Sequence, residues 1–391
     1  MVRLASRGDG VTESGRHVPM AAPGDLLLPD ESLEAGPHRA VPPCRHFPEC
    51  GGCQLQHVDD EAYGGFLKDR IASALAAQGL TEPDILTPHI SPPLSRRRAS
   101  LHAESRGKQV LLGFKAERSH QIIDMRECFI LRTELFALVA PLRKLMGELL
   151  GPRGSGGVRM TLADQGADIL LDKVSAEGLQ ASEALTAFAQ TYRLARLSID
   201  DGYGPQTRWE PEPVTVILSG IPVPLPHGAF LQATEEGEAA LVEAVREAVG
   251  GGRVVADLFA GLGTFALSLE GRVLAAEGAR DAALALKGAA DRAQRQVFVD
   301  HRDLFRRPYD AKELTRFEAV VLDPPRAGAK EQTPFLARST VPRIAFVSCN
   351  PATFARDAKV LIDGGYRLDW VKPVGQFRWS THVELVGAFS R

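Results

Sequence analysis

The last third of the chain alternates short apolar runs with helical segments, and this alternation limits its fold more than any other feature. The apolar runs span four to six residues and occur in RVVADLF, RVLAAEG, QVFVD, FEAVVLDPP and RIAFVSC, between residues 253 and 349. Such runs separated by helices are typical of parallel strands that are buried on both faces of a sheet. The segments YRLDWVKPVG and HVELVGAF close the chain with a short link between them, so we expect them to pair antiparallel.

Composition sets broad limits on the class of protein. The chain has 391 residues, of which 44% are hydrophobic and 24% are charged, so we expect a globular protein of two or three domains. No apolar stretch has the length of a membrane span, and the first residues lack the apolar core of a signal peptide, so we expect no membrane association and a cytoplasmic location. The net charge of −3 gives no basic field, so nucleic acid could bind only through local patches such as residues 96–98 and 301–307, which otherwise are solvated surface.

The part of the chain before residue 230 has a different pattern. Residues 1–43 are rich in glycine and proline and indicate either a small β-module or a poorly ordered arm. Residues 66–79, FLKDRIASALAAQG, predict an amphipathic helix that ends at its glycine. Residues 90–230 alternate short β-type runs with turn signals, and EALTAFAQTYRL is a candidate helix among them. We therefore expect a mainly β domain before the α/β sheet.

The segment VVADLFAGLGTFALSL, residues 254–269, predicts a nucleotide-type cofactor site. A strand ends in Asp257 and is followed by a Gly-x-Gly turn, which we expect to lead into a helix. Glu277 ends the next strand, where a carboxylate can bind the two hydroxyls of a ribose. Ala266 replaces the third glycine of the dinucleotide fingerprint. The combination favours S-adenosylmethionine over a dinucleotide.

The segment VVLDPPRAG, residues 320–328, places a carboxylate at the end of another strand. Two prolines fix the backbone after Asp323 and direct its side chain away from the sheet edge, although a plain strand-terminating turn would have the same appearance. In amino-group methyltransferases the position after the prolines is usually aromatic, whereas here it is Arg326. This residue argues against that class.

Four of the five cysteines predict a metal site. Cys44, Cys50 and Cys53 have the spacing C-x5-C-x2-C, and Cys128 is a possible fourth ligand. The odd total and the absence of a secretion signal argue against a disulfide framework. Four thiolates can hold zinc or an iron–sulfur cluster, and the spacing does not decide between them.

The remaining cysteine, Cys349, follows a buried strand and precedes Pro351, which suits a first helical turn. It therefore lies at the carboxyl end of a strand, where open α/β sheets bind their ligands, although a lone cysteine is often a buried structural residue. Glu384 lies on the last strand between Val383 and Leu385, where a charge is costly unless it has a partner or a function.

Taken together, these motifs resemble the RNA 5-methyluridine methyltransferase family, in particular its iron–sulfur-containing branch. CGGCQLQH, GAFLQAT, DLFAGLGTF, LDPPRAG, VSCNPATFARD and HVEL follow one another in the family's order. The resemblance implies three parts: a TRAM-like RNA-binding β segment at 1–40, a central mainly β domain at 41–232 with the cluster, and a Rossmann-like class I methyltransferase domain at 233–391. The chain departs from the family in SRRRAS, which lacks a usual tyrosine, and at Ala260, where the family has a cysteine.

The resemblance also implies the roles of individual residues. Cys44, Cys50, Cys53 and Cys128 would hold a [4Fe–4S] cluster, while Cys349 would be the nucleophile and Glu384 the base. The cofactor and base pocket would consist of Gln232, Phe259, Thr264, Glu277, Asp303 and Asp323. A thiolate that adds to carbon 6 of uracil makes carbon 5 nucleophilic, and a base must afterwards remove the proton from carbon 5.

The function expected from this resemblance is methylation of carbon 5 of one uridine in RNA by S-adenosylmethionine, through a covalent cysteine–uracil intermediate. Ribosomal RNA of the 23S class is the expected substrate because the cluster-bearing branch is mostly ribosomal, and we expect a monomer. The alternatives are a transfer RNA substrate, or an RNA-binding or folding factor without catalysis.

Overall fold

The computed structural model of the protein describes residues 1–81, 83–107 and 109–391, and these residues form two compact units. The first unit comprises residues 1–59, 92–216 and 378–381. The second comprises residues 60–91, 217–377 and 382–391. Each unit is therefore assembled from separate stretches of the chain.

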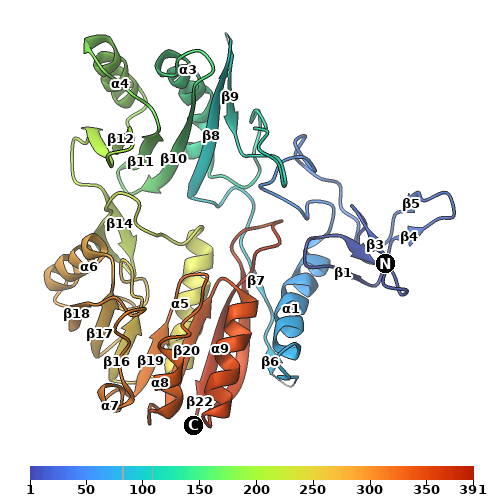
Figure 1. Ribbon diagram of the computed structural model, residues 1–391, viewed down its shortest axis with the longest axis vertical. Coiled ribbons are helices and arrows are strands. Elements are labelled where there is room, and N and C mark those ends of the chain that lie inside the picture. The colour runs from blue at the N-terminus through green and yellow to red at the C-terminus, as the bar shows by residue number, and fades with distance from the viewer. Residues whose placement is uncertain (82, 108) are drawn as a thin grey trace. The chain divides into compact units, whose positions relative to one another are not determined.

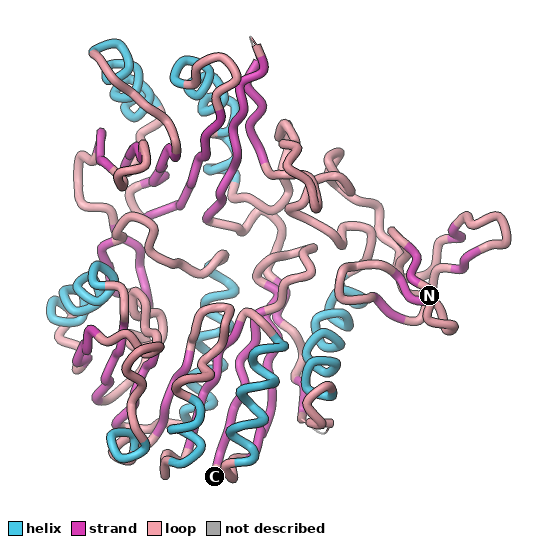
Figure 2. Tube along the Cα trace, viewed as in Figure 1, coloured by secondary structure: helices cyan, strands magenta, loops and turns pink. Residues whose placement is uncertain are grey.

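The first unit begins with strands of two residues each. β1 (Arg3–Leu4), β2 (Gly10–Val11) and β3 (His17–Val18) form an antiparallel sheet, and β4 (Leu26–Leu27) pairs with β5 (Leu33–Glu34). These short strands are visible at the N-terminal end of the chain in Figure 2. Residues 1–40 therefore form a small β-module, and its TRAM-like character stays a prediction.

A six-stranded sheet forms the larger part of the first unit, with the strand order β13-β12-β11-β10-β8-β9. Its strands are β8 (Arg98–Arg106), β9 (Gln109–Gly113), β10 (Ser155–Ala163), β11 (Gly166–Asp172), β12 (Arg196–Asp200) and β13 (Gln206–Trp209). Its helices are α2 (Thr133–Ala137), α3 (Val139–Leu149) and α4 (Leu179–Thr191). The expected mainly β domain with a helix near 183–194 is confirmed, and β14 (Thr215–Leu218) and β15 (Ile221–Pro224) form a two-stranded sheet after it.

The second unit is built on one large sheet with the strand order β18-β17-β16-β19-β20-β22-β21-β6, and β7 also pairs with β21. The strands are β6 (Asp84–Ile85), β7 (His89–Ile90), β16 (Val254–Leu258), β17 (Arg272–Glu277), β18 (Val297–His301), β19 (Ala319–Leu322), β20 (Arg343–Ser348), β21 (Arg367–Gly375) and β22 (Glu384–Ser390). The strands from β18 to β20 are parallel, and β22 runs antiparallel to both β20 and β21. The expected parallel strands between residues 253 and 349 and the expected antiparallel pairing of the last two strands are therefore both confirmed.

Helices cover this sheet, as Figure 1 shows. They are α1 (Asp60–Ala76), α5 (Glu235–Val249), α6 (Arg280–Arg292), α7 (Ala311–Leu314), α8 (Thr333–Arg338) and α9 (Pro351–Asp363). α8 and α9 pack together, and α1 packs against α9 and β21. None of the helices in the described ranges has both the length and the hydrophobicity to cross a membrane.

The division into units differs from the expected domain bounds. Residues 60–91 and 217–232, which we expected in the central domain, belong to the unit of the large sheet. The reason is packing: α1 buries Tyr63, Phe66 and Leu67, and β6 and β7 add parallel pairs to β21. The helix expected at 66–79 also begins earlier, at Asp60, and its C-terminal turn ends at Gly79, which has a positive φ of 75°.

One expected helix does not form. After the Gly-x-Gly turn, residues 261–268 adopt consecutive turns instead of an α-helix. Gly261 and Gly263 have φ angles of 55° and 94°, in the left-handed region, which interrupts a helix at its start. The backbone hydrogen bonds in this segment are mixed: Leu267 N to Gly263 O and Leu269 N to Phe265 O span four residues, whereas Ser268 N to Phe265 O spans three.

The N-terminus of α5 yields a test of this fold. The Thr234 hydroxyl accepts a hydrogen bond from the Gly237 N–H at 3.0 Å and lies 2.8 Å from the Ser91 hydroxyl, so it joins α5 to the segment after β7. We expect Thr234→Ala to lower the free energy of unfolding by about 1–2 kcal/mol, because a helix cap and a buried hydroxyl both lose their partner. Urea denaturation measures this loss.

The matched control is Thr186→Ala in α4, where the hydroxyl donates only to the Ser182 carbonyl of its own helix. This variant should unfold within about 0.5 kcal/mol of the wild type, as most surface substitutions do. Equal stability of Thr234→Ala and the wild type would show that the cap does not hold α5 in place.

Candidate functional site

The carboxyl ends of the parallel strands bring several predicted residues to one edge of the large sheet. Leu258 pairs with both Ala276 of β17 and Leu322 of β19. Phe259, Glu277 and Asp323 are each the next residue along their strands. They therefore lie side by side at this edge, where open α/β sheets bind their ligands.

Cys349 and Glu384 lie next to each other on neighbouring strands. The last recorded pair of β20 and β22 is Ser348 with Leu385. Because the two strands are antiparallel, one further step of this register puts Cys349 opposite Glu384. Asn350 then caps α9 by accepting a hydrogen bond from the Ala352 N–H at 3.1 Å. The thiol is thus held between a strand and a helix N-terminus.

The thiol and the carboxylates at this edge affect one another. Burial raises the pKa of Cys349 to about 11, and the negative charges of Glu384 and Asp323 add to this shift, while Arg326 opposes it. Burial also raises the pKa of Asp323 well above its usual value, and Glu384 and Asp257 raise it further. The structure therefore brings the predicted nucleophile, the predicted base and Asp323 into one electrostatic cluster.

Asp257 is a further carboxylate in this cluster, and its side chain is completely buried. Burial raises its pKa to about 7; the Ala266 N–H opposes the shift and Glu277 adds to it. Within the described part of the chain, neither carboxylate oxygen of Asp257 has a hydrogen bond of good geometry. Asp257 interacts electrostatically with Glu277 and with Asp323. It therefore connects the predicted cofactor end of the site, at Glu277, with the end that contains Cys349.

Glu277 holds the turn after β16. Its carboxylate accepts hydrogen bonds from the Gly261 N–H at 2.7 Å and from the Ala279 N–H at 2.6 Å. The carboxylate thus lies against the Gly-x-Gly turn, where the sequence predicts the ribose. An ionised carboxylate has about four acceptor positions, so two remain for the hydroxyls of a ligand.

Phe259 has a φ of 67°, which is rare for a residue other than glycine. Its ring packs against the ring of Phe305, with 5.4 Å between centroids and an angle of 53°. Asp303 follows β18, is exposed, and accepts a hydrogen bond from the Phe305 N–H at 3.0 Å. Thr264 is half-buried in the turns after β16. Because His301 pairs with Glu277, the segment with Asp303 lies at the same edge of the sheet as the predicted ribose ligand.

Gln232 forms a pair with Gln376. The Gln232 carbonyl oxygen accepts a hydrogen bond from the Gln376 amide at 2.8 Å, and the Gln376 carbonyl oxygen accepts one from the Ala233 N–H at 2.8 Å. Both side chains are buried. Gln376 follows β21, where Val374 pairs with Glu384, so this amide pair belongs to the same end of the site as the predicted base.

Three residues of this site were not predicted as site residues by the sequence analysis. Gln376 lies in a short link between two strands and carries no motif. Phe305 is part of HRDLFRR, which was considered as a basic patch and of which only Asp303 was assigned to the pocket. Asp257 was treated as a strand end, although a charged residue that closes an apolar run is itself a signal of a functional carboxylate.

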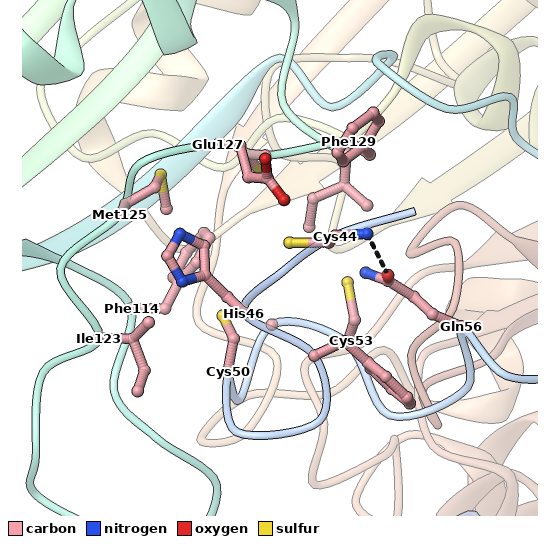
Figure 3. Close-up of a pocket in the computed structure, with 14 residues that line it drawn as sticks. Cys44, His46, Cys50, Cys53, Gln56, Phe114, Ile123, Met125, Glu127 and Phe129 are labelled. Carbon is pink, nitrogen blue, oxygen red and sulfur yellow. Dashed lines mark hydrogen bonds between the residues drawn. The ribbon is translucent and has the colours of Figure 1, made fainter. Parts of the chain in front are cut away.

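The four predicted metal ligands lie in the first unit and line one small cavity of about 20 Å³. Figure 3 shows the sulfur atoms of Cys44, Cys50 and Cys53 around this space. Gly51 allows the chain to approach closely, because a Cβ there would lie 2.7 Å from the Lys115 carbonyl oxygen. The Cys44 N–H donates to the Gln56 side chain at 3.3 Å.

The four thiols share one cavity, but in the described ranges no three His, Cys, Asp or Glu side chains are placed so that they could hold a metal ion. Burial raises the pKa of the Cys53 thiol to about 12, so a ligand role would require a strong cation to displace the proton. The half-buried Arg96 interacts electrostatically with Cys128 and Cys53 and could offset part of the thiolate charge. The expectation that residues 96–98 form solvated surface is wrong, since Arg97 is 5% exposed.

Known proteins resemble the chain over almost its whole length. An RNA methyltransferase of Zymomonas mobilis, itself uncharacterized, is 56% identical over 393 residues, which cover 100% of this chain and 99% of that protein. The 23S rRNA (uracil(1939)-C(5))-methyltransferase RlmD of Chromohalobacter salexigens is 33% identical and matches 92% of this chain and 78% of that protein. The family profile described as tRNA (Uracil-5-)-methyltransferase matches residues 226–390.

The fold is that of a known methyltransferase. The tRNA (uracil-54, C5)-methyltransferase of Pyrococcus abyssi, solved with S-adenosyl-L-homocysteine, has a TM-score of 0.75 and is 22% identical, covering 99% of this chain and 98% of that one. The large sheet of the second unit thus has the class I methyltransferase fold. On the sequence relatives and the family profile together, the chain belongs to the RNA uracil-5-methyltransferase family and is an enzyme of that family.

Proposed function

We propose that the protein methylates carbon 5 of one uridine in 23S ribosomal RNA, through a covalent bond between Cys349 and the uracil ring. The observation that carries this proposal is the placement of Cys349 opposite Glu384 at the ligand-binding edge of the sheet. A relative at 33% identity that acts on 23S rRNA supports the choice of RNA. The tRNA family profile makes transfer RNA the second candidate substrate.

The chemistry needs one nucleophile and one base. The Cys349 sulfur forms a bond to carbon 6 of uracil, and the π electrons of the ring shift to make carbon 5 nucleophilic. Cys349 attacks as the thiolate, after its proton has been lost to solvent. Carbon 5 then forms a bond to the methyl group of S-adenosylmethionine, the bond between that methyl and the sulfonium sulfur breaks, and S-adenosylhomocysteine leaves. Glu384 then removes the proton from carbon 5, the bond between sulfur and carbon 6 breaks, and the thiolate is restored.

The neighbouring residues would hold the two substrates. Asp323, whose charge acts on Cys349, and the Gln232 amide, which is bonded to Gln376, would hold the polar edge of the uracil. Glu277 would bind the ribose hydroxyls of the cofactor, with Phe259, Thr264 and Asp303 around it. The target base must leave its stack to reach the thiol, so we expect a flipped or looped uridine.

Two features of the site favour a cationic cofactor. Asp257, Asp323 and Glu384 form a crowded row of carboxylates, and a sulfonium would relieve their repulsion. The raised pKa of Cys349 keeps it a thiol in the free enzyme, and the same sulfonium charge would lower that pKa when the cofactor binds. The nucleophile would thus become reactive only in the loaded site.

We also propose that Cys44, Cys50, Cys53 and Cys128 hold a [4Fe–4S] cluster in the first unit. The common cavity of the four thiols and the nearby Arg96 charge support a shared site, and the choice of a cluster over zinc follows from the resemblance to the iron–sulfur-containing branch. Its role would be structural or in RNA positioning, since the methyl transfer moves no single electron. We further propose that the enzyme acts as a monomer in the cytoplasm.

The first prediction separates the nucleophile from the base. Cys349→Ala should give neither methylated RNA nor a covalent adduct, because the ring is never activated. Glu384→Gln should slow turnover by about 10²- to 10⁴-fold and accumulate methylated RNA bound to the protein, because only the last proton transfer is lost. Denaturing electrophoresis with labelled S-adenosylmethionine detects the adduct.

The control is the double variant Cys349→Ala with Glu384→Gln, which should form no adduct. Normal turnover by Glu384→Gln, or an adduct that survives the loss of Cys349, would contradict these roles. Parallel reactions with 23S rRNA and with transfer RNA identify the substrate.

The second prediction concerns Asp257. Its pKa of about 7 means that it is half-protonated near neutral pH, so binding of the S-adenosylmethionine cation should release protons at pH 7. The release should decrease at pH 5, where Asp257 stays protonated, and at pH 9, where it is already ionised. Calorimetry in buffers of different ionisation enthalpy measures the proton count.

S-adenosylhomocysteine, which lacks the sulfonium charge, is the matched ligand and should release fewer protons from the wild type. Asp257→Asn should reduce the release with S-adenosylmethionine. Equal proton release for the two ligands would exclude the proposed coupling between the carboxylates and the sulfonium.

The third prediction concerns the metal. Protein purified without oxygen should contain about four iron and four sulfide per chain and absorb visible light. Cys50→Ser or Cys53→Ser should remove most of the iron, whereas Cys349→Ser should keep it. Stoichiometric zinc in the wild type, without visible absorption, would overturn the cluster proposal.

A further inference from the structure

Arg70 occupies an unusual position on α1. The buried residues of this helix, Tyr63, Phe66, Leu67, Ile71 and Leu75, form one apolar stripe at helical spacing. Arg70 lies three residues after Leu67 and is only partly exposed, so its charge lies at the edge of that stripe. α1 packs against α9, the helix that follows Cys349 (Figure 1).

The backbone of a second arginine, Arg326, is fixed against the N-terminus of α9. The Arg326 carbonyl oxygen accepts hydrogen bonds from the Asn350 amide and the Thr353 hydroxyl, both at 3.2 Å. These bonds hold the loop after Asp323 against the first turn of α9. The Arg326 side chain is exposed, and its charge acts on the Cys349 thiol.

The charges of the two guanidiniums act on each other, and neither has a carboxylate counterion among the described residues. Burial, and after it the charge of Arg326, lowers the pKa of Arg70. In the described part of the chain, neither arginine has an ion pair with a carboxylate, and the Nε atom of Arg70 is buried without a hydrogen-bond partner. Like charges in this arrangement are unfavourable until an anion binds between them.

We infer that Arg70 and Arg326 together bind a backbone phosphate of the RNA strand beside the target uridine. Arginine suits this task because its planar guanidinium can hold two phosphate oxygens at once. The N-terminus of α9 adds a positive partial charge at the same place. Arg70 would thereby act as a positioning residue that holds the strand while the base reaches Cys349. This inference rests on the proposed RNA substrate.

The carboxylate of S-adenosylmethionine is another anion that could reach this part of the site. The location of the arginines on the Cys349 side favours the RNA. Glu277, the residue predicted to bind the cofactor ribose, interacts with Asp257 and with the turn at Gly261. The charges of both Asp257 and Glu384 act on Asp323, which therefore separates the predicted cofactor end of the site from the end with Glu384. Cofactor affinity is therefore a separate readout from RNA affinity.

The test measures the salt dependence of RNA binding to the full chain. The probe is a fluorescein-labelled single-stranded oligouridylate, titrated at several KCl concentrations. We expect Arg70→Gln to weaken binding about tenfold and to reduce the slope of log Kd against log [KCl] by about 0.7, which corresponds to one lost phosphate contact. Arg70→Lys, which keeps the charge, should retain most of the slope. A purely structural role of Arg70 would leave the slope unchanged.

The control is Arg272→Gln. Arg272 begins β17, at the opposite edge of the same sheet, and its side chain is exposed, so this variant should keep the wild-type slope. An unchanged slope in Arg70→Gln would overturn the inference, and so would a loss of S-adenosylmethionine affinity without a change in RNA binding. If the wild type neither binds nor methylates RNA, the proposed function itself fails, and that result is distinct from these two.

Discussion

The crowding of carboxylates at one edge of the large sheet is the constraint on which the site depends. Parallel strands end at the same edge, so Asp257, Glu277 and Asp323 are brought together by the same strand pairing that builds the core. The antiparallel strand β22 adds Glu384 beside Cys349. Burial and mutual repulsion raise the pKa values of Asp257 and Asp323, so a cation bound in the site would favour their ionised forms.

This charge distribution links cofactor binding to reactivity. Asp257 is buried between the two ends of the site and interacts electrostatically with Glu277 and with Asp323. The proposed sulfonium would change the charge felt by every member of the row, including the Cys349 thiol. Arg326, whose charge lowers the pKa of Cys349, and Arg70 would supply positive charge for the RNA. The site would therefore attract a cation and a polyanion to neighbouring positions.

Much of the second unit could be predicted because its signals are local. Apolar runs located the strands, and the residue after each run located the edge with Asp323 and Cys349. Other features depend on tertiary contacts that have no local signal. The Gln232–Gln376 pair joins segments 144 residues apart, and α1 packs in the second unit although most of its neighbours in sequence belong to the first. The turns after Gly261 also differ from the expected helix because two positive φ angles outweigh the apolar pattern.

The central claim is that Cys349 forms a bond to the uracil that is methylated. The most direct test uses target RNA in which the uridine carries fluorine at carbon 5, because no base can then remove a proton and the adduct cannot resolve. With S-adenosylmethionine, mass spectrometry of the digested complex should find a methylated 5-fluorouridine attached to the peptide that contains Cys349. An adduct on another residue, or no adduct under conditions in which the unmodified RNA is methylated, would contradict the account.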